Sequence, residues 1–200
     1  MDKAIVYIHG QGGSSEEAKH YQPLFKDCDV IGFDYTSQFP WEAKDEFSGF
    51  VDSICRQYKT VTLIANSIGA FFAMNALSDK QIEKAYFISP VVNMEKLIED
   101  MMLWANVSEA QLHEKGVIET SFGQTLSWEY LSYVRKHRID WKVPTHILYG
   151  SNDNLTSIET ITEFANKTDA TLTVMENGEH WFHTVEQMKF LDNWIEAFAR

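Results

Sequence analysis

The sequence predicts an α/β fold, in which a doubly wound, mostly parallel six-stranded sheet carries helices on both faces. Short runs of apolar, often β-branched residues alternate along the chain with longer segments of helical periodicity. The strands are then separated by segments long enough to serve as the crossovers that parallel neighbours need. The chain has 200 residues, 44% of them hydrophobic and 23% charged, which suits one compact domain with its own core.

The expected strands are short apolar segments closed by glycine, proline or a polar turn. The first of them, KAIVYIH, has no polar alternation, which is typical of a strand covered on both faces. The six expected strands are Lys3–His9, Asp29–Tyr35, Thr60–Asn66, Ala85–Ser89, Thr145–Tyr149 and Thr171–Met175.

The segments between these strands have apolar residues at helical spacing. Ser14 and Ser15 precede two glutamates, which is a typical helix start with acidic residues in its first turn. Further helices are expected over Trp41–Tyr58, directly after Gly69, over SIETITEFANK and over about Thr184–Ala199.

One segment, between Val92 and Trp141, breaks this alternation. It has no strand pattern and is too long for a loop, so we expect it to form helices. No repeat or flexible linker separates it from the rest. We therefore expect a single domain over residues 1–200, with a helical insertion at about residues 93–141.

The chain is acidic, with a formal net charge of −12 from 17 basic and 29 acidic residues. Such a field repels phosphate backbones and anionic lipids, so we expect neither a nucleic acid nor a membrane partner.

The two cysteines, Cys28 and Cys55, have no CxxC spacing and no histidine pattern for zinc, so no metal site is expected. The first apolar run is too short for a signal peptide or a membrane span, which favours the cytoplasm.

The segment Ala65-Asn66-Ser67-Ile68-Gly69 stands between an apolar strand and a helix. This is the context of a nucleophile elbow, in which a sharp turn lifts the serine hydroxyl above the sheet and small residues are needed two positions before and after it. The pattern here is AxSxG rather than GxSxG. Ser67 is therefore a candidate nucleophile, and the alternative is that it only caps the helix that follows.

A serine hydroxyl needs a base to remove its proton and an acid to orient that base. His180 lies in the loop between the last strand and the last helix, and is favoured over His183, which stands closer to the start of that helix. Asp153 follows the preceding strand, and its alternative role is that of an ordinary turn residue. The expected catalytic residues are thus Ser67, Asp153 and His180.

An acyl-transfer reaction also needs two amide groups that stabilise the negatively charged oxygen of the intermediate. The glycine-rich loop after the first strand, HGQGG, and the residue after Ser67 supply candidates, namely the amides of Gln11 and Ile68. The alternative role of this loop, phosphate binding, lacks the lysine and the glycine spacing of the known phosphate loops.

Together, the HG loop, the elbow at Ser67, GSNDNLT and GEHWFHT resemble the α/β-hydrolase superfamily over essentially the whole chain. The resemblance implies a version of that fold without the usual first antiparallel hairpin, catalysis without metal or organic cofactor, and acyl transfer to water. It also implies that the insertion forms a cap. The departures from the family pattern are Ala65, where glycine is usual, and Asn66, where histidine is frequent.

The expected substrates are small or medium carboxylic esters, with Gly10, Met101, Trp104 and Trp181 as candidate substrate-binding residues. The apolar stripe of the insertion has an alternative explanation, which is that it only packs that segment. Thioester, amide or carbon–carbon bond hydrolysis and perhydrolysis use the same three residues, and a non-catalytic binding protein is a further alternative. The oligomeric state is left open between a monomer and a homodimer.

Overall fold

A computed structural model describes residues 2–199, which divide into two compact units. The first unit comprises residues 1–92 and 140–200, less the two terminal residues, and the second is the segment Asn93–Ile139. Each unit is described by itself.

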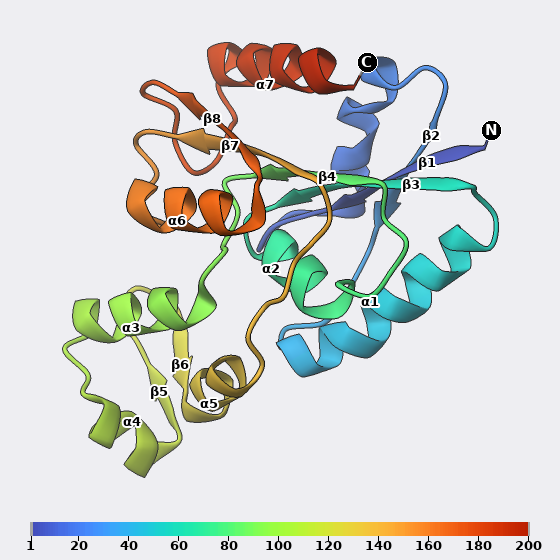
Figure 1. The fold of residues 1–200 in the computed structure, drawn as a ribbon. Coiled ribbons are helices and arrows are strands. Elements are labelled where there is room, and N and C mark those ends of the chain that lie inside the picture. The colour runs from blue at the N-terminus through green and yellow to red at the C-terminus, as the bar shows by residue number, and fades with distance from the viewer. Residues whose placement is uncertain (1, 200) are drawn as a thin grey trace. The chain divides into compact units, whose positions relative to one another are not determined.

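The first unit is built on a six-stranded sheet in the order β2-β1-β3-β4-β7-β8 (Figure 1). Every neighbouring pair in this sheet is parallel. The strands are β1 Lys3–Ile8, β2 Asp29–Phe33, β3 Thr60–Asn66, β4 Lys84–Ile88, β7 Thr145–Gly150 and β8 Thr171–Met175. The six strands and the parallel, doubly wound sheet expected from the sequence are confirmed.

Both faces of this sheet are covered, as the apolar strands without alternation predict. Helix α7, Val185–Phe198, and the short 3-10 helices η1, Ser15–His20, and η2, Gln22–Leu24, lie on one face. Helices α1, Pro40–Cys55, α2, Ile68–Ala76, and α6, Ile158–Thr168, lie on the other (Figure 1).

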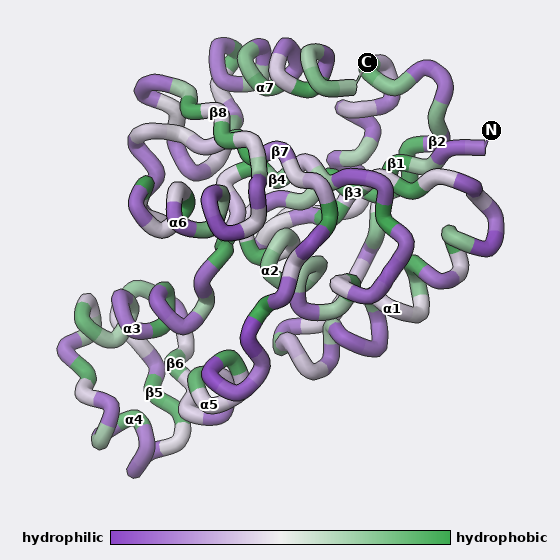
Figure 2. The backbone as a smooth tube through the Cα atoms, viewed as in Figure 1, coloured by the Kyte–Doolittle hydropathy of each residue, from purple (hydrophilic) through white to green (hydrophobic). Residues whose placement is uncertain are grey.

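Side chains alternate between these two cores along each strand, as the pleat requires. On β1, Ile5 and Tyr7 belong to the core under η1 and α7, whereas Val6 and Ile8 are buried on the opposite face. Figure 2 shows the hydropathic difference between helices: α2 is almost uniformly hydrophobic, whereas α7 alternates between hydrophobic and hydrophilic residues, as a helix with one solvent face does.

Two local features differ from the sequence expectation. The segment after the glycine-rich loop forms 3-10 turns instead of an α-helix. Pro23 lacks an amide donor, so η1 cannot continue through it, and it stands instead in the first turn of η2. The second unit, expected to be helical, also contains an antiparallel pair of strands, β5 Val117–Glu119 and β6 Thr125–Ser127. Gly116 and Gly123, both at positive φ, form the turns next to these strands.

The second unit has helices α3 Met94–Trp104, α4 Glu109–Lys115 and α5 Trp128–Lys136, and a small core of its own. Arg135 on α5 ties this unit together: its guanidinium donates to Glu95 at 2.8 Å, to Glu99 at 3.2 Å and to both carboxylate oxygens of Glu109. Buried apolar residues of this unit include Ile98, Met102, Leu112, Leu126, Leu131 and Val134.

Candidate active site

Ser67 stands at the turn between β3 and α2 in a strained backbone conformation, with φ 49° and ψ −120°. The turn is very tight: a Cβ added at Gly69 would lie 2.3 Å from the carbonyl oxygen of His9, so only glycine fits there. Ala65, at the other small position, is fully buried. Ser67 occupies the cap position of α2, yet its hydroxyl makes no capping hydrogen bond to the helix.

The Ser67 hydroxyl is instead paired with a histidine. Ser67 Oγ lies 2.9 Å from His180 Nε2, and His180 Nδ1 lies 2.7 Å from Asp153 Oδ2. The Asp153 side chain has no exposed area and that of His180 is 15% exposed. The structure therefore brings the three residues together in the order that links a hydroxyl, an imidazole and a carboxylate.

The two carboxylate oxygens of Asp153 make different hydrogen bonds, one to His180 and the other to the backbone of its own loop. While Oδ2 faces His180, Oδ1 accepts the amide N–H groups of Leu155 at 2.8 Å and Thr156 at 3.1 Å. The turn role and the role as histidine partner, which the sequence presented as alternatives, are thus both present in one side chain. These hydrogen bonds fix the carboxylate plane before any substrate arrives.

The loops that carry Asp153 and His180 are hydrogen-bonded to each other. The Asn152 amide donates to the carbonyl of Gly178 at 2.8 Å, and the Asn177 amide donates to Ser151 Oγ at 2.8 Å. Both loops leave the carboxyl ends of β7 and β8, where sites of open α/β sheets form.

The other candidate histidine points elsewhere. His183 Nδ1 lies 2.7 Å from the carbonyl oxygen of Trp181, and its ring stacks on the Trp181 ring at a centroid distance of 4.4 Å. His183 is exposed, and no hydrogen bond among residues 2–199 joins it to Ser67. The structure thus pairs His180, rather than His183, with the serine.

The glycine-rich loop lies against the elbow. A Cβ added at Gly10 would lie 3.2 Å from Ser67 Cβ, and the Gly13 amide donates to the Gly10 carbonyl at 3.1 Å, which closes a turn around Gln11. Ile68 is the first residue of α2, so its amide has no acceptor within the helix. Both amides named from the sequence thus come from segments adjacent to Ser67.

The candidate substrate-binding residues are distributed over both units. Gly10 is next to Ser67, and Trp181 follows His180 with 72% of its surface exposed. Met101 and Trp104 lie on α3 of the second unit, where the ring of Trp104 packs edge-on against Phe122. Their part in substrate binding stays a prediction.

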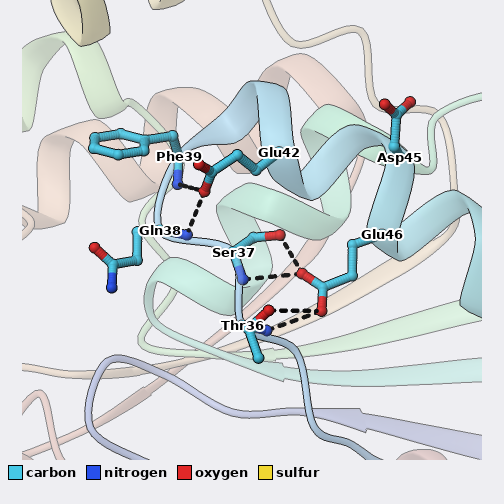
Figure 3. A pocket seen from close by; sticks show the side chains of 7 residues that line it. All are labelled: Thr36, Ser37, Gln38, Phe39, Glu42, Asp45 and Glu46. Atoms are coloured by element: carbon cyan, nitrogen blue, oxygen red, sulfur yellow. Dashed lines mark hydrogen bonds between the residues drawn. The ribbon is translucent and has the colours of Figure 1, made fainter.

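A recess elsewhere in the first unit does not include these residues (Figure 3). It lies at the start of α1, and its carboxylates hold the preceding loop: Glu46 accepts hydrogen bonds from the amides and hydroxyls of Thr36 and Ser37. Burial opposes ionisation of Glu46, but these hydrogen bonds outweigh it and lower the pKa of the carboxyl. Glu42 accepts the amides of Gln38 and Phe39 in the same way.

Within residues 2–199, no three or more His, Cys, Asp or Glu side chains are grouped so as to hold a metal ion. No helix in the same range combines the length and the apolar character needed to span a bilayer.

No protein-family model matches the chain. Over 75 residues the chain is 31% identical to "Putative esterase/lipase 3" of Mycoplasma genitalium; the match covers 36% of this chain and 27% of that protein, so it spans only about a quarter of its relative.

Solved structures match over almost the whole chain. Est1E from Butyrivibrio proteoclasticus is 17% identical with a TM-score of 0.76, and the match covers 98% of this chain and 86% of Est1E. The mouse alpha/beta hydrolase domain-containing protein 10 is 14% identical, also with a TM-score of 0.76, over 98% of this chain and 89% of the mouse chain. At such identities the similarity is one of fold.

Proposed function

Because the chain has the α/β-hydrolase fold, we propose that it is a serine hydrolase that cleaves small or medium carboxylic esters through an acyl-enzyme intermediate. In this proposal Ser67 is the nucleophile, His180 is the general acid and base, and Asp153 orients His180. The observation that carries it is the continuous hydrogen-bonded path from Ser67 Oγ to His180 at 2.9 Å and from His180 to Asp153 at 2.7 Å. The hydrolase and esterase names among the structural and sequence relatives support the same reaction class.

The first half of the reaction forms the acyl-enzyme. His180 Nε2 takes the proton of Ser67 Oγ as this oxygen attacks the ester carbonyl carbon, which gives a tetrahedral intermediate with a negatively charged oxygen. The amides of Gln11 and Ile68 stabilise that oxygen. The protonated His180 then gives its proton to the departing alcohol, and the acyl group remains on Ser67.

The second half repeats these steps with water. His180 accepts a proton from a water molecule, the resulting hydroxide attacks the acyl carbon, and Ser67 leaves with the proton returned by His180. Asp153 keeps His180 in the tautomer that carries a proton on Nδ1, which leaves Nε2 free to act as the base. The carboxylic acid is then released.

A fluorophosphonate probe tests the nucleophile directly, because it phosphonylates an activated serine. We expect labelling of the wild type and none of Ser67→Ala. Ser53→Ala is the matched control, because Ser53 lies on α1 and its hydroxyl donates only to the Phe50 carbonyl. Absence of labelling and of ester hydrolysis in the wild type would overturn the enzyme proposal in favour of a binding protein.

A panel of substrates tests the reaction type. p-Nitrophenyl acetate and butyrate, an acyl thioester, an anilide and a carbon–carbon bond substrate are compared by kcat/KM. We expect the carboxylic esters to rank first. A higher kcat/KM for the thioester, the anilide or the carbon–carbon bond substrate would replace the ester assignment while leaving Ser67 as the nucleophile.

A further inference from the structure

The two amides of the proposed oxyanion hole belong to segments that follow different strands. Gln11 lies in the loop after β1, and Ile68 follows Ser67 after β3. The distance between these amides is therefore set by how the glycine-rich loop is held against the elbow. The two segments are in van der Waals contact where His9 meets Gly69 and where Gly10 meets Ser67. Such steric contacts keep the segments from moving closer together but do not keep them from moving apart.

A chain of hydrogen bonds joins the same two segments and resists their separation. Asn66, the residue before the nucleophile, donates from Nδ2 to the hydroxyl of Tyr7 at 2.9 Å. The Tyr7 hydroxyl donates in turn to Oε2 of Glu17. Glu17 Oε1 accepts the amide of Ser14 at 3.3 Å, at the end of the glycine-rich loop.

The direction of each hydrogen bond follows from the groups themselves. An ionised Glu17 has no hydrogen to give, so the Tyr7 hydroxyl must donate to it and its oxygen is left to accept from Asn66. Tyr7 is 1% exposed, and its pKa is raised far above the ordinary phenol value, first by burial and then by Tyr21 and Glu17, so the hydroxyl keeps its proton. Asn66 Oδ1 is buried without a partner among residues 2–199, so the bond to Tyr7 is what fixes this side chain.

We propose that Tyr7, Glu17 and Asn66 are positioning residues, which set the spacing between the Gln11 and Ile68 amides and thereby the stabilisation of the transition state. This inference rests on the proposed function. None of the three touches the reacting atoms. Their effect passes through the backbone at both ends: Glu17 holds Ser14 and the loop that contains Gln11, and Asn66 holds the strand end that continues into Ser67 and Ile68.

Tyr7→Phe tests the chain by removing one oxygen from its centre while keeping the buried ring. We expect kcat for p-nitrophenyl butyrate to fall by about 10- to 100-fold with KM changed less than about threefold, because a small misplacement of an oxyanion donor acts in the transition state. Tyr86→Phe is the matched control: Tyr86 is equally buried in the same core, and its hydroxyl donates to the Phe198 carbonyl at 2.7 Å. We expect wild-type kcat from this control.

A second pair of variants avoids the core altogether. Glu17 is exposed, so Glu17→Ala removes the acceptor of Tyr7 without a buried cavity, and we expect kcat to fall in the same direction. Glu17→Gln has a single acceptor oxygen, which can accept from Tyr7 or from the Ser14 amide but not from both, so we expect it to recover only part of the loss. The control is Glu16→Ala, an exposed neighbour on η1 whose carboxylate pairs with Lys19.

The affinity of a trifluoromethyl ketone separates positioning from loss of folded protein. Ser67 adds to the ketone carbonyl, its proton passes to His180, and the resulting oxyanion needs both amides. We expect the inhibition constant to rise in Tyr7→Phe by the same factor by which kcat/KM falls, with kcat calculated per active site counted by endpoint fluorophosphonate labelling. A mere loss of folded molecules would reduce the count of sites and leave the inhibition constant unchanged.

Two different outcomes would contradict the positioning role and the proposed function separately. If the wild type hydrolyses esters but Tyr7→Phe and Glu17→Ala keep kcat within twofold of Tyr86→Phe and Glu16→Ala, the positioning role is overturned and the hydrolase proposal stands. If the wild type shows neither hydrolysis nor labelling, the proposed function itself fails.

Discussion

Gly150 and Gly178 are in direct backbone contact: a Cβ added at position 150 would lie 2.4 Å from the carbonyl group of Gly178. Gly150 ends β7 and Gly178 follows β8, so this contact joins the loops that carry Asp153 and His180. The absence of a side chain at position 150 is therefore a condition for the short distance between the carboxylate and the imidazole.

Gly150→Ala is expected to separate these two loops. Because the obstacle is backbone, it cannot move aside as a flexible side chain does, and we expect kcat to fall by at least about tenfold together with a lower Tm. Gly49→Ala is the control, because nothing lies within 4 Å of a Cβ there and alanine favours the helix α1, stabilising by about 0.5–1 kcal/mol. Turnover and thermal unfolding of both variants measure the difference; equal turnover would show that the two loops tolerate separation.

Asp153→Asn is expected to fold normally and to lose turnover by about 10⁴-fold. An asparagine oxygen can still accept the Leu155 and Thr156 amides and so preserve the turn, but its NH₂ group facing His180 holds the imidazole in the wrong tautomer. The checks are circular dichroism and kcat. Asp140→Asn, which breaks only the exposed ion pair with Lys142, should keep both; undiminished activity of Asp153→Asn would mean that another acid orients His180.

Glu46→Gln is expected to weaken the fold in a pH-dependent way. The folded-state pKa of Glu46 lies below its ordinary value of 4.5, so its contribution is complete above that value and is lost as the pH falls through the folded pKa. At neutral pH we expect a loss of about 1 kcal/mol, since the hydrogen bonds to Thr36 and Ser37 are charge-assisted but partly solvated.

Urea unfolding at pH 7 and at pH 3.5 measures this effect for Glu46→Gln. The difference between wild type and variant should shrink at the lower pH. The control is Asp45→Asn, the adjacent exposed carboxylate, for which we expect little change at either pH. A constant difference at both pH values would assign the loss to packing rather than to the charge.

Arg135→Met is expected to loosen the second unit selectively. The guanidinium is the common partner of three glutamates on α3 and α4, and its removal leaves like charges close together. We expect amide hydrogen exchange to quicken within residues 93–139 and to stay unchanged in the central strands of the sheet. The exposed Arg138→Met serves as control, and an equal effect of both variants would remove the special role of Arg135.

Most of the fold follows from the sequence because the sheet is buried on both faces. Continuous apolar runs such as Ile5–Ile8 leave little ambiguity about which segments are strands. The β5–β6 pair was not predicted, because strands of three residues are too short to show a period-two pattern. The difference at η1 arises because capping signals mark where a helical turn begins but do not fix whether it continues as an α-helix.

The site was accessible to sequence reasoning for a topological reason. Ser67, Asp153 and His180 each follow a parallel strand, and the carboxyl ends of parallel strands share one edge of the sheet. The hydrogen-bond chain through Tyr7 was not predicted, because a tyrosine within an apolar strand has the same pattern as a core residue. Glu17 likewise resembled an ordinary first-turn acid, and only the structure brings its carboxylate to Tyr7 and Ser14.

The segment Asn93–Ile139 is part of the connection between β4 and β7, which are adjacent parallel strands. The chain must leave the carboxyl end of β4 and return to the amino end of β7, so any shortened version still has to run the length of a strand, on the order of 17 Å. We expect a replacement segment that can span this distance to leave the pairing of β4 with β7 unchanged. The insertion can therefore be exchanged between relatives of this chain without altering the strands that precede Ser67, Asp153 and His180.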